Sequence, residues 1–190
     1  MRTPHVILLL GAALLWGAGH ARAAGQLVRS TATPQAKLAY EQARELAAAN
    51  YKNARAQCDA VTGNPKDVCV AEAKAARVRT EEEARAKYED TLKAYTRARM
   101  RIADAEYDRD KTKCAGMTGN DKDVCQAQAK AALVAARADA KAQQKTIEAR
   151  NEARDEKLDA DWKVAKERCD AFAGAARDQC MSNAKTQFGK

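Results

Sequence analysis

Histidine is almost absent from this chain, and both copies, His5 and His20, lie within the first 20 residues. Serine is equally scarce, because Ser30 and Ser182 are the only two and each stands alone. Without a histidine base, the rest of the chain cannot form a Ser-His-Asp or Cys-His catalytic site. It also has no histidine metal ligand, no GxGxxG motif and no P-loop. We therefore expect a protein that is not an enzyme and that has no catalytic residue, cofactor or metal.

Long apolar runs are also missing, except for one at the N-terminus. Residues 6–18 are apolar, a length that matches the core of a signal peptide and is too short to cross a bilayer. Arg2 precedes this run, and residues 21–23 read Ala-Arg-Ala, the pattern that a signal peptidase recognises. We expect a signal peptide over residues 1–23, cut after its last residue, with an uncleaved N-terminal anchor as the alternative.

The charge of the chain changes little when the signal peptide is removed. Residues 1–23 contain Arg2 and Arg22 and no acidic residue, so the formal net charge falls from +8 to +6. Charged residues of both signs make up 32% of the chain, so this surplus alone does not define a binding site. A periplasmic or secreted location favours an envelope protein or an anionic envelope polymer as partner and argues against nucleic acid. We expect no transmembrane segment after cleavage, and the oligomeric state stays open.

Three segments align without gaps and reveal an internal triplication with a period of 55 to 56 residues. In each, an aromatic residue lies seven positions before the first Cys, and ten residues separate the two Cys. A Gly follows the first Cys by five positions, and an Asp precedes the second by two. The three repeats cover about residues 51–78, 107–134 and 162–189. The aromatic residues are Tyr51, Tyr107 and Trp162, the glycines Gly63, Gly119 and Gly174, and the aspartates Asp67, Asp123 and Asp178.

The cysteines are even in number, and an exported chain meets an oxidising environment, so we expect disulfides. Six cysteines allow fifteen pairings, and only one local set gives every repeat the same structure. The spacing matches neither a CxxC zinc knuckle nor a redox CxxC, and a Cys₄ metal site pooled from two repeats is the alternative. The expected bonds are Cys58–Cys69, Cys114–Cys125 and Cys169–Cys180.

Each repeat is predicted to form two helices joined by a tight turn. A Gly after a helical run is the favoured left-handed residue that ends a helix. Asn64 and Asn120 are good N-caps for the following helix, and Pro65 suits its first position. Asp67 comes three residues after its cap, where a carboxylate favours the positive end of the helix. The third repeat has Ala175 in place of the Asn, so we expect a looser turn there.

Two long stretches, residues 66–115 and 120–173, contain neither Gly nor Pro and are rich in strong helix formers. We expect each to form one helix of about 50 residues, or two helices with a soft break. A narrow, mostly alanine seam with steps of three or four residues runs along them, as in a coiled coil. In the first stretch the seam consists of Tyr88, Leu92, Tyr95, Met100, Ala103, Tyr107 and Cys114. In the second it consists of Cys125, Ala129, Ala132, Ala136, Ala140, Ile147, Leu158, Trp162, Ala165 and Cys169.

The predicted fold is all-α, a coiled-coil-like up-down bundle of long antiparallel helices with three disulfide-stapled hairpins. Residues 24–34 form a flexible leader and residues 35–190 the helical domain. A shorter helix over 35–61 precedes the two long stretches and another over 176–188 follows them, so turns one and three should lie at the same end. The consecutive glutamates at 81–83 are expected on a solvated helix face.

The Ala/Lys/Glu-rich stretches, residues 81–93 and 126–157, resemble the helical rod of TolA-type cell-envelope proteins. We expect this chain to differ from that family in having no persistent membrane anchor and no globular domain after the rod. Paired cysteines also occur in twin-Cys hairpins of the CHCH kind, but those carry two cysteines per helix. The resemblance implies an envelope spacer or interaction module. The alternative is a periplasmic chaperone or stress protein that binds clients or anionic envelope ligands.

Overall fold

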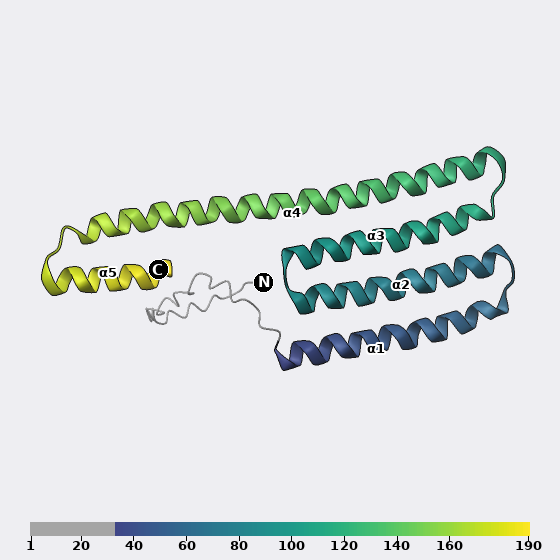
Figure 1. Ribbon diagram of the computed structural model, residues 1–190, viewed down its shortest axis with the longest axis horizontal. Coiled ribbons are helices and arrows are strands. Elements are labelled where there is room, and N and C mark those ends of the chain that lie inside the picture. Colours follow the sequence, from purple (N-terminus) through teal and green to yellow (C-terminus); the bar gives the residue numbers. More distant parts are fainter. Residues whose placement is uncertain (1–32) are drawn as a thin grey trace, which may run out of the picture.

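The computed structural model describes residues 33–190, which form α-helices joined by short turns, with no strand in this range (Figure 1). The predicted signal peptide, the rest of the leader up to residue 32 and the predicted cleavage site lie outside the described residues. The all-α class and the three stapled hairpins are confirmed. The elements are α1 (Pro34–Gln57), a 3-10 turn η1 (Cys58–Ala60), α2 (Asn64–Glu89), α3 (Leu92–Ala115), α4 (Gly119–Cys169) and α5 (Gly174–Phe188).

The helices run alternately up and down, and each packs only against its neighbours along the chain (Figure 1). Helix α1 contacts α2, α2 contacts α3, and α3 lies along the first half of α4, while α5 lies against the last part of α4. No packing joins α1 to α3 or to α4 among the described residues. The predicted up-down order is therefore confirmed as an open layer of helices with two solvent-exposed faces.

Alanine makes up most of the thin seams between the helices, as the sequence predicts. Most buried apolar side chains are alanines, and the largest side chains that are fully buried are Cys58, Cys114 and Cys169. At about 25 cal/mol per Å² of buried apolar surface, each alanine stabilises the fold by less than about 1 kcal/mol. Cross-linking by disulfides therefore provides stability that the seams do not supply.

The first long stretch forms two helices, which was the alternative expectation, and the chain reverses direction between them at Asp90. Asp90 has left-handed backbone angles (φ 44°, ψ 45°), and its N–H donates to the carbonyl of Ala86 at 2.9 Å. Thr91 then caps α3, because its hydroxyl accepts a hydrogen bond from the N–H of Ala94 at 3.1 Å. The second long stretch is continuous, since α4 runs for 51 residues.

This additional reversal changes which turns lie together. The first and second turns lie at one end of the layer, and the third lies at the far end of α4 (Figure 1). The side-chain amide of Asn64 in the first turn donates to the carbonyl of Thr112, near the second turn, at 2.9 Å. The prediction that turns one and three lie at the same end is therefore wrong, because it counted residues 66–115 as a single pass.

The turn glycines all have positive φ, 66° at Gly63 and 56° at Gly119 and Gly174, as the choice of Gly at these positions predicts. They open the following helix, however, and do not end the preceding one. Gly63 is itself the N-cap of α2, so Asn64 is the first helical residue and its side chain bonds elsewhere. Asn120 is likewise inside α4. The prediction that these asparagines are N-caps is wrong, because α2 already begins at Asn64 and α4 one residue before Asn120.

Candidate binding surfaces

All six cysteines form the predicted disulfides, and no cysteine is free. Each bond joins Cα atoms 5.6 Å apart across a hairpin, an ordinary separation for a disulfide. Since every cysteine is used in this way, none is left to ligate a metal. Among the described residues, no group of three or more Cys, His, Asp or Glu side chains is placed to hold an ion.

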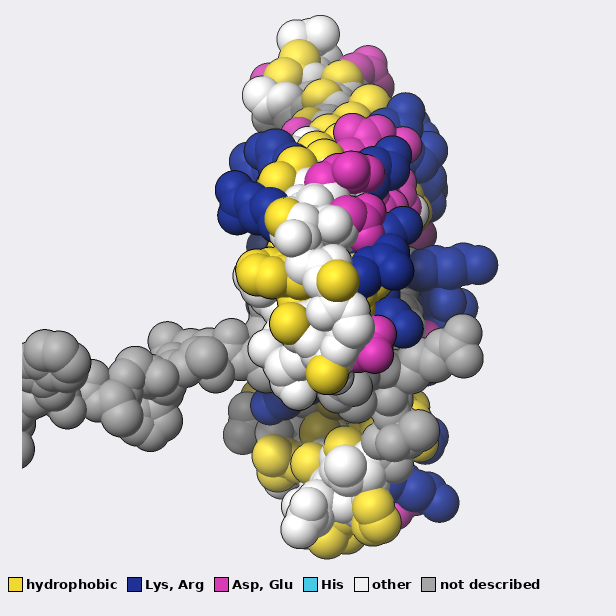
Figure 2. Space-filling view, turned by 90° about the vertical axis from the view of Figure 1, so that its left-hand side faces the viewer, with side chains coloured by type: hydrophobic (Ala, Val, Ile, Leu, Met, Phe, Trp, Pro, Cys, Tyr) yellow, Lys and Arg dark blue, Asp and Glu magenta, His cyan; other side chains and the backbone are white. Residues whose placement is uncertain are grey.

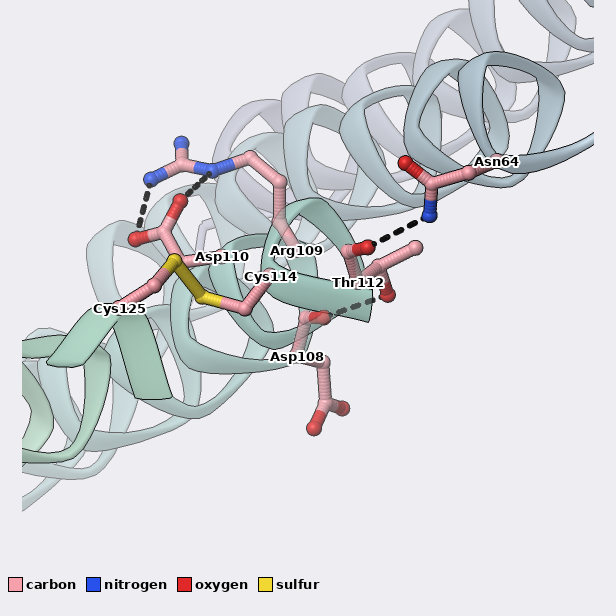
Figure 3. The surroundings of a disulfide bond; sticks show 7 residues. All are labelled: Asn64, Asp108, Arg109, Asp110, Thr112, Cys114 and Cys125. Carbon is pink, nitrogen blue, oxygen red and sulfur yellow. Dashed lines mark hydrogen bonds and ion pairs between the residues drawn. A yellow bond between two sulfur atoms is a disulfide. The ribbon is translucent and has the colours of Figure 1, made fainter. Parts of the chain in front are cut away.

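One hydrogen bond, from Asn64 to the carbonyl of Thr112, joins the first hairpin to the segment next to the middle disulfide (Figure 3). One helical turn before Cys114, the guanidinium of Arg109 donates to both carboxylate oxygens of Asp110, at 2.8 and 3.0 Å. This hydrogen-bonded cation lowers the pKa of Asp110 below its usual value. Gly116 lies against Asn64, and a Cβ at Gly116 would come within 2.4 Å of the amide oxygen. The two hairpins therefore contact each other closely at this end of the layer.

The three repeat aromatics hold their own hairpins together and do not form a joint binding stripe. Arg77 lies over the ring of Tyr51 at 5.5 Å, and Lys130 lies over the ring of Tyr107 at 5.6 Å. In the third hairpin the partner is aromatic, because Phe188 packs against Trp162 with ring centroids 6.1 Å apart. All three repeat aromatics are half-buried. Their positions fit the sequence-based view that they are the large residues of a thin seam.

Glu82 is the site residue that the sequence reasoning placed wrongly. The glutamates at 81–83 were expected on a solvated face, yet Glu82 is only 5% exposed and lies between α2 and α3. Its carboxylate is 3.3 Å from the guanidinium of Arg85 and 3.3 Å from that of Arg101. This buried carboxylate between two cations links α2 and α3 by charge. The seam residues next to it are alanines. Glu82 and Arg101 can meet only if the chain reverses near residue 90. The sequence did not predict that reversal, because no Gly or Pro marks it.

We predict that Glu82→Ala lowers the free energy of unfolding by about 1–2 kcal/mol, because both arginines then lose their partner in a half-buried seam. The loss is smaller than for a fully buried pair, since the two guanidiniums keep access to water. Urea unfolding followed by circular dichroism measures it. The matched control is Glu83→Ala on the same helix: Glu83 is exposed and 3.8 Å from Arg79, so the expected change is below about 0.5 kcal/mol. Equal losses for the two variants would contradict a specific role for Glu82.

One basic groove of about 670 Å³ lies between the start of α2 and the end of α3. Lys66, Lys74 and Lys111 line it, together with Asp67 and Asp108. Acidic and basic side chains therefore alternate along this groove. Its mixed charge does not by itself select an anionic ligand.

A second groove of about 810 Å³ runs between the end of α4 and α5, and most of the residues that line it are apolar. Leu158, Val164 and Phe172 line it and are all exposed, Phe172 to 51%. Figure 2 looks onto the end of the molecule that carries this third hairpin and shows hydrophobic side chains at the surface among charged ones. Among the described residues, α5 packs on α4 and on no other helix.

Ion pairs fasten the third hairpin at both ends. Near the turn, Arg177 donates to the carboxylate of Asp170 at 2.7 Å. At the other end, the ammonium of Lys190 is 2.6 Å from the carboxylate of Asp159 and lowers the pKa of that carboxyl. The groove is thus held between a disulfide and two surface ion pairs.

The fold and its surfaces define a class of protein: an open layer of antiparallel helices, stapled at each repeat turn by a disulfide. The chain matches no protein-family model, and no curated protein and no solved structure is significantly similar to it. No helix of residues 33–190 is long and apolar enough to cross a membrane. Functional inferences therefore depend on the geometry of the layer and on the third hairpin.

Proposed function

We propose that this protein is a non-enzymatic interaction module of the cell envelope, exported to the periplasm or secreted. Three disulfides support this assignment, because such bonds persist in oxidising compartments. The resemblance of its alanine-rich helices to the rod of TolA-type proteins points the same way. Since every cysteine serves as a staple, the cysteines have a structural purpose that calls for no catalysis.

The single observation that carries the proposal is the way α4 extends beyond the rest of the layer. With 51 residues at about 1.5 Å each, α4 is about 75 Å long, and only its first half has α3 beside it. Its far end carries the third hairpin with the apolar groove. A long helix of this kind acts as a spacer that holds a binding surface away from the three-helix end.

Site-specific photo-crosslinking in intact cells tests the proposal. A photo-reactive residue at Phe172, in the groove, is expected to give a discrete adduct with an envelope component. A matched residue at Val61, an exposed apolar position in the first turn, is the control and should give far less. If the two positions give the same adducts, or neither gives any, the groove is not the contact surface and the proposed role is overturned.

The second candidate is a periplasmic chaperone, and the exposed apolar lining of the third hairpin favours it. A chaperone binds many unfolded clients, whereas an interaction module binds one partner. In the same crosslinking experiment, a chaperone would give a broad set of adducts that increases under heat or oxidative stress. Suppression of the aggregation of a reduced model protein by the purified chain, and its loss in Phe172→Ser, would also favour this candidate.

A further inference from the structure

The two segments that join consecutive hairpins have related sequences but different structures. Between Cys69 and Cys114 the chain forms the bent pair α2–α3, whereas between Cys125 and Cys169 it forms the straight α4. The repeats on either side align at offsets of 56 and 55, so the second segment is one residue shorter. Residues 91–94 read Thr-Leu-Lys-Ala, and their counterparts 146–149 read Thr-Ile-Glu-Ala. With the one-residue gap placed at the turn, the residue without a counterpart is Asp90, the left-handed residue at which the chain reverses.

Helix α2 packs on α3 through a stripe of small residues. The counterparts of these residues in α4 are exposed to solvent. The stripe is buried or half-buried, with Ala86 only 2% exposed. It comprises Ala71, Ala75, Val78, Glu82 and Ala86. The counterparts, 56 residues later, are all exposed, with Val134 at 57%. They are Ala127, Ala131, Val134, Ala138 and Ala142. They lie on the side of α4 opposite to Ala129 and Leu133, which are buried in the seam beneath α3.

The α3 residues of that interface also have exposed counterparts in α4. The exposed counterparts of the α2 and α3 residues together are the bare stripe of α4. Helix α3 meets α2 through residues that are buried or half-buried, namely Ala94, Ala98, Ala105 and Arg109. Their counterparts, 55 residues later, are Ala149, Ala153, Ala160 and Val164, and all four are exposed. Together the bare residues of α4 recur every 11 residues, with Ala at 127, 138, 149 and 160. An 11-residue repeat keeps such a stripe on one side of a nearly straight helix.

We infer that the bare stripe of α4 binds the same stripe of a second copy, with the two α4 helices antiparallel. Within one chain, the α2-like half (127–142) and the α3-like half (149–164) cannot meet, because α4 lacks the residue that would reverse it. In an antiparallel pair centred near Ile147, each half faces the other kind of half from the second copy. The contact that α2 and α3 make within the chain would thereby be made twice between chains.

The buried area and the charges at one ion pair suit this pairing. The ion pair Glu89–Arg97, at 3.5 Å, has Lys145 and Glu152 as its counterparts, so the charges remain complementary with signs exchanged. The stripe from residue 127 to residue 164 is about 57 Å long at 1.5 Å per residue, and a helix is about 10–12 Å wide. The pair would therefore cover roughly 600 Å² per copy, or roughly 1,200 Å² in total, which exceeds the roughly 1,000 Å² of a specific interface. Helix α3 lies on the other side of α4, and of the stripe residues Val164, at one end, also lines the groove beside α5.

Sedimentation velocity on the oxidised protein, from 1 to 100 µM, tests the inference. The expected species is a dimer, and Val134→Arg or Ala149→Arg should weaken dimerisation at least tenfold. Ile147→Arg is the matched control, because Ile147 is 42% exposed on the same helix but faces the side that α3 and α5 occupy. Circular dichroism should show unchanged helix content for all three. A monomer at 100 µM, or equal weakening by the control, would overturn the inference.

The direction of the pair is tested separately with a photo-reactive residue at Val134. The antiparallel arrangement predicts a crosslink to the peptide around Ala160 of a second copy. A crosslink to the region around Val134 itself would mean a parallel pair, and a crosslink to residues 149–164 of the same chain would mean a bent monomer. Either result would overturn the antiparallel dimer. The proposed envelope role is tested elsewhere, at Phe172, so the two ideas can fail independently.

Discussion

Deletion of Asp90 is expected to straighten α2 and α3 into one helix of about 51 residues, as long as α4. Asp90 is the only non-glycine residue of the described chain with positive φ, and the hairpin reverses there. Without it, Glu89 or Thr91 would have to adopt the left-handed conformation, which costs about 1–2 kcal/mol for an ordinary L-residue. The natural comparison is α4, where the corresponding residue is absent and the helix is continuous.

The change in shape is large enough to measure directly. Lys66 and Lys111 line the same groove in the hairpin, and in a straight helix they would be about 66 Å apart. Distance measurements between spin labels at these positions, attached by a chemistry that spares the cysteines, would detect the change. Asp90→Gly is the control, because Gly adopts positive φ readily and should keep the short distance. A short distance in the deletion variant would show that tertiary packing, and not residue 90, sets the reversal.

Removal of the third disulfide, in Cys169→Ala/Cys180→Ala, is expected to release α5 from α4. The bond closes a loop of about a dozen residues, which the chain-entropy model values at about 3 kcal/mol, or roughly a hundredfold in the opening equilibrium. The remaining ties are the packing of Trp162 on Phe188 and two exposed ion pairs. Exposed pairs contribute about 0–1 kcal/mol each, and an isolated helix of 15 residues is marginal in water.

Amide hydrogen exchange measures this release residue by residue. In the variant, protection of α5 should fall about a hundredfold, while α1, α2 and α3 keep theirs. The matched variant is Cys58→Ala/Cys69→Ala, which removes an equivalent bond from the first hairpin. Helix α1 should stay protected there, because it packs along α2 and Tyr40 stacks on Tyr88 at 5.1 Å. Unchanged protection of α5 would show that the hairpin packing alone is sufficient to hold it.

The sequence predicted the elements that depend on local signals. The cysteine spacing and the turn glycines predicted three hairpins with the observed disulfides. Both features determine local structure, within about a dozen residues of the chain. The reversal at Asp90 was missed, since no Gly or Pro marks it and a left-handed Asp is rare. That one omission placed turn three at the wrong end and Glu82 on a solvated face.

In the seam of α4, single residues also differ from the prediction made from local signals. Ala129, Ala140 and Cys169 are buried as predicted, whereas Ala132 is exposed and Leu133 is buried in its place. Ile147 belongs to the predicted seam but is exposed, because none of the described helices lies beside the middle of α4. Periodicity identifies a helix face, but the neighbour that covers the face depends on where the chain reverses.

The open layer also has a consequence for how the protein comes apart. Since each helix touches only those before and after it, the stability of the layer is close to a sum of terms from adjacent pairs, as in solenoid proteins. Such a chain need not melt in one cooperative step. It can unzip from either edge, with α5 leaving at one end and α1 at the other, while α3 stays held between α2 and α4. The helices then unfold in an order set by their position in the layer, with the edge helices before the inner ones.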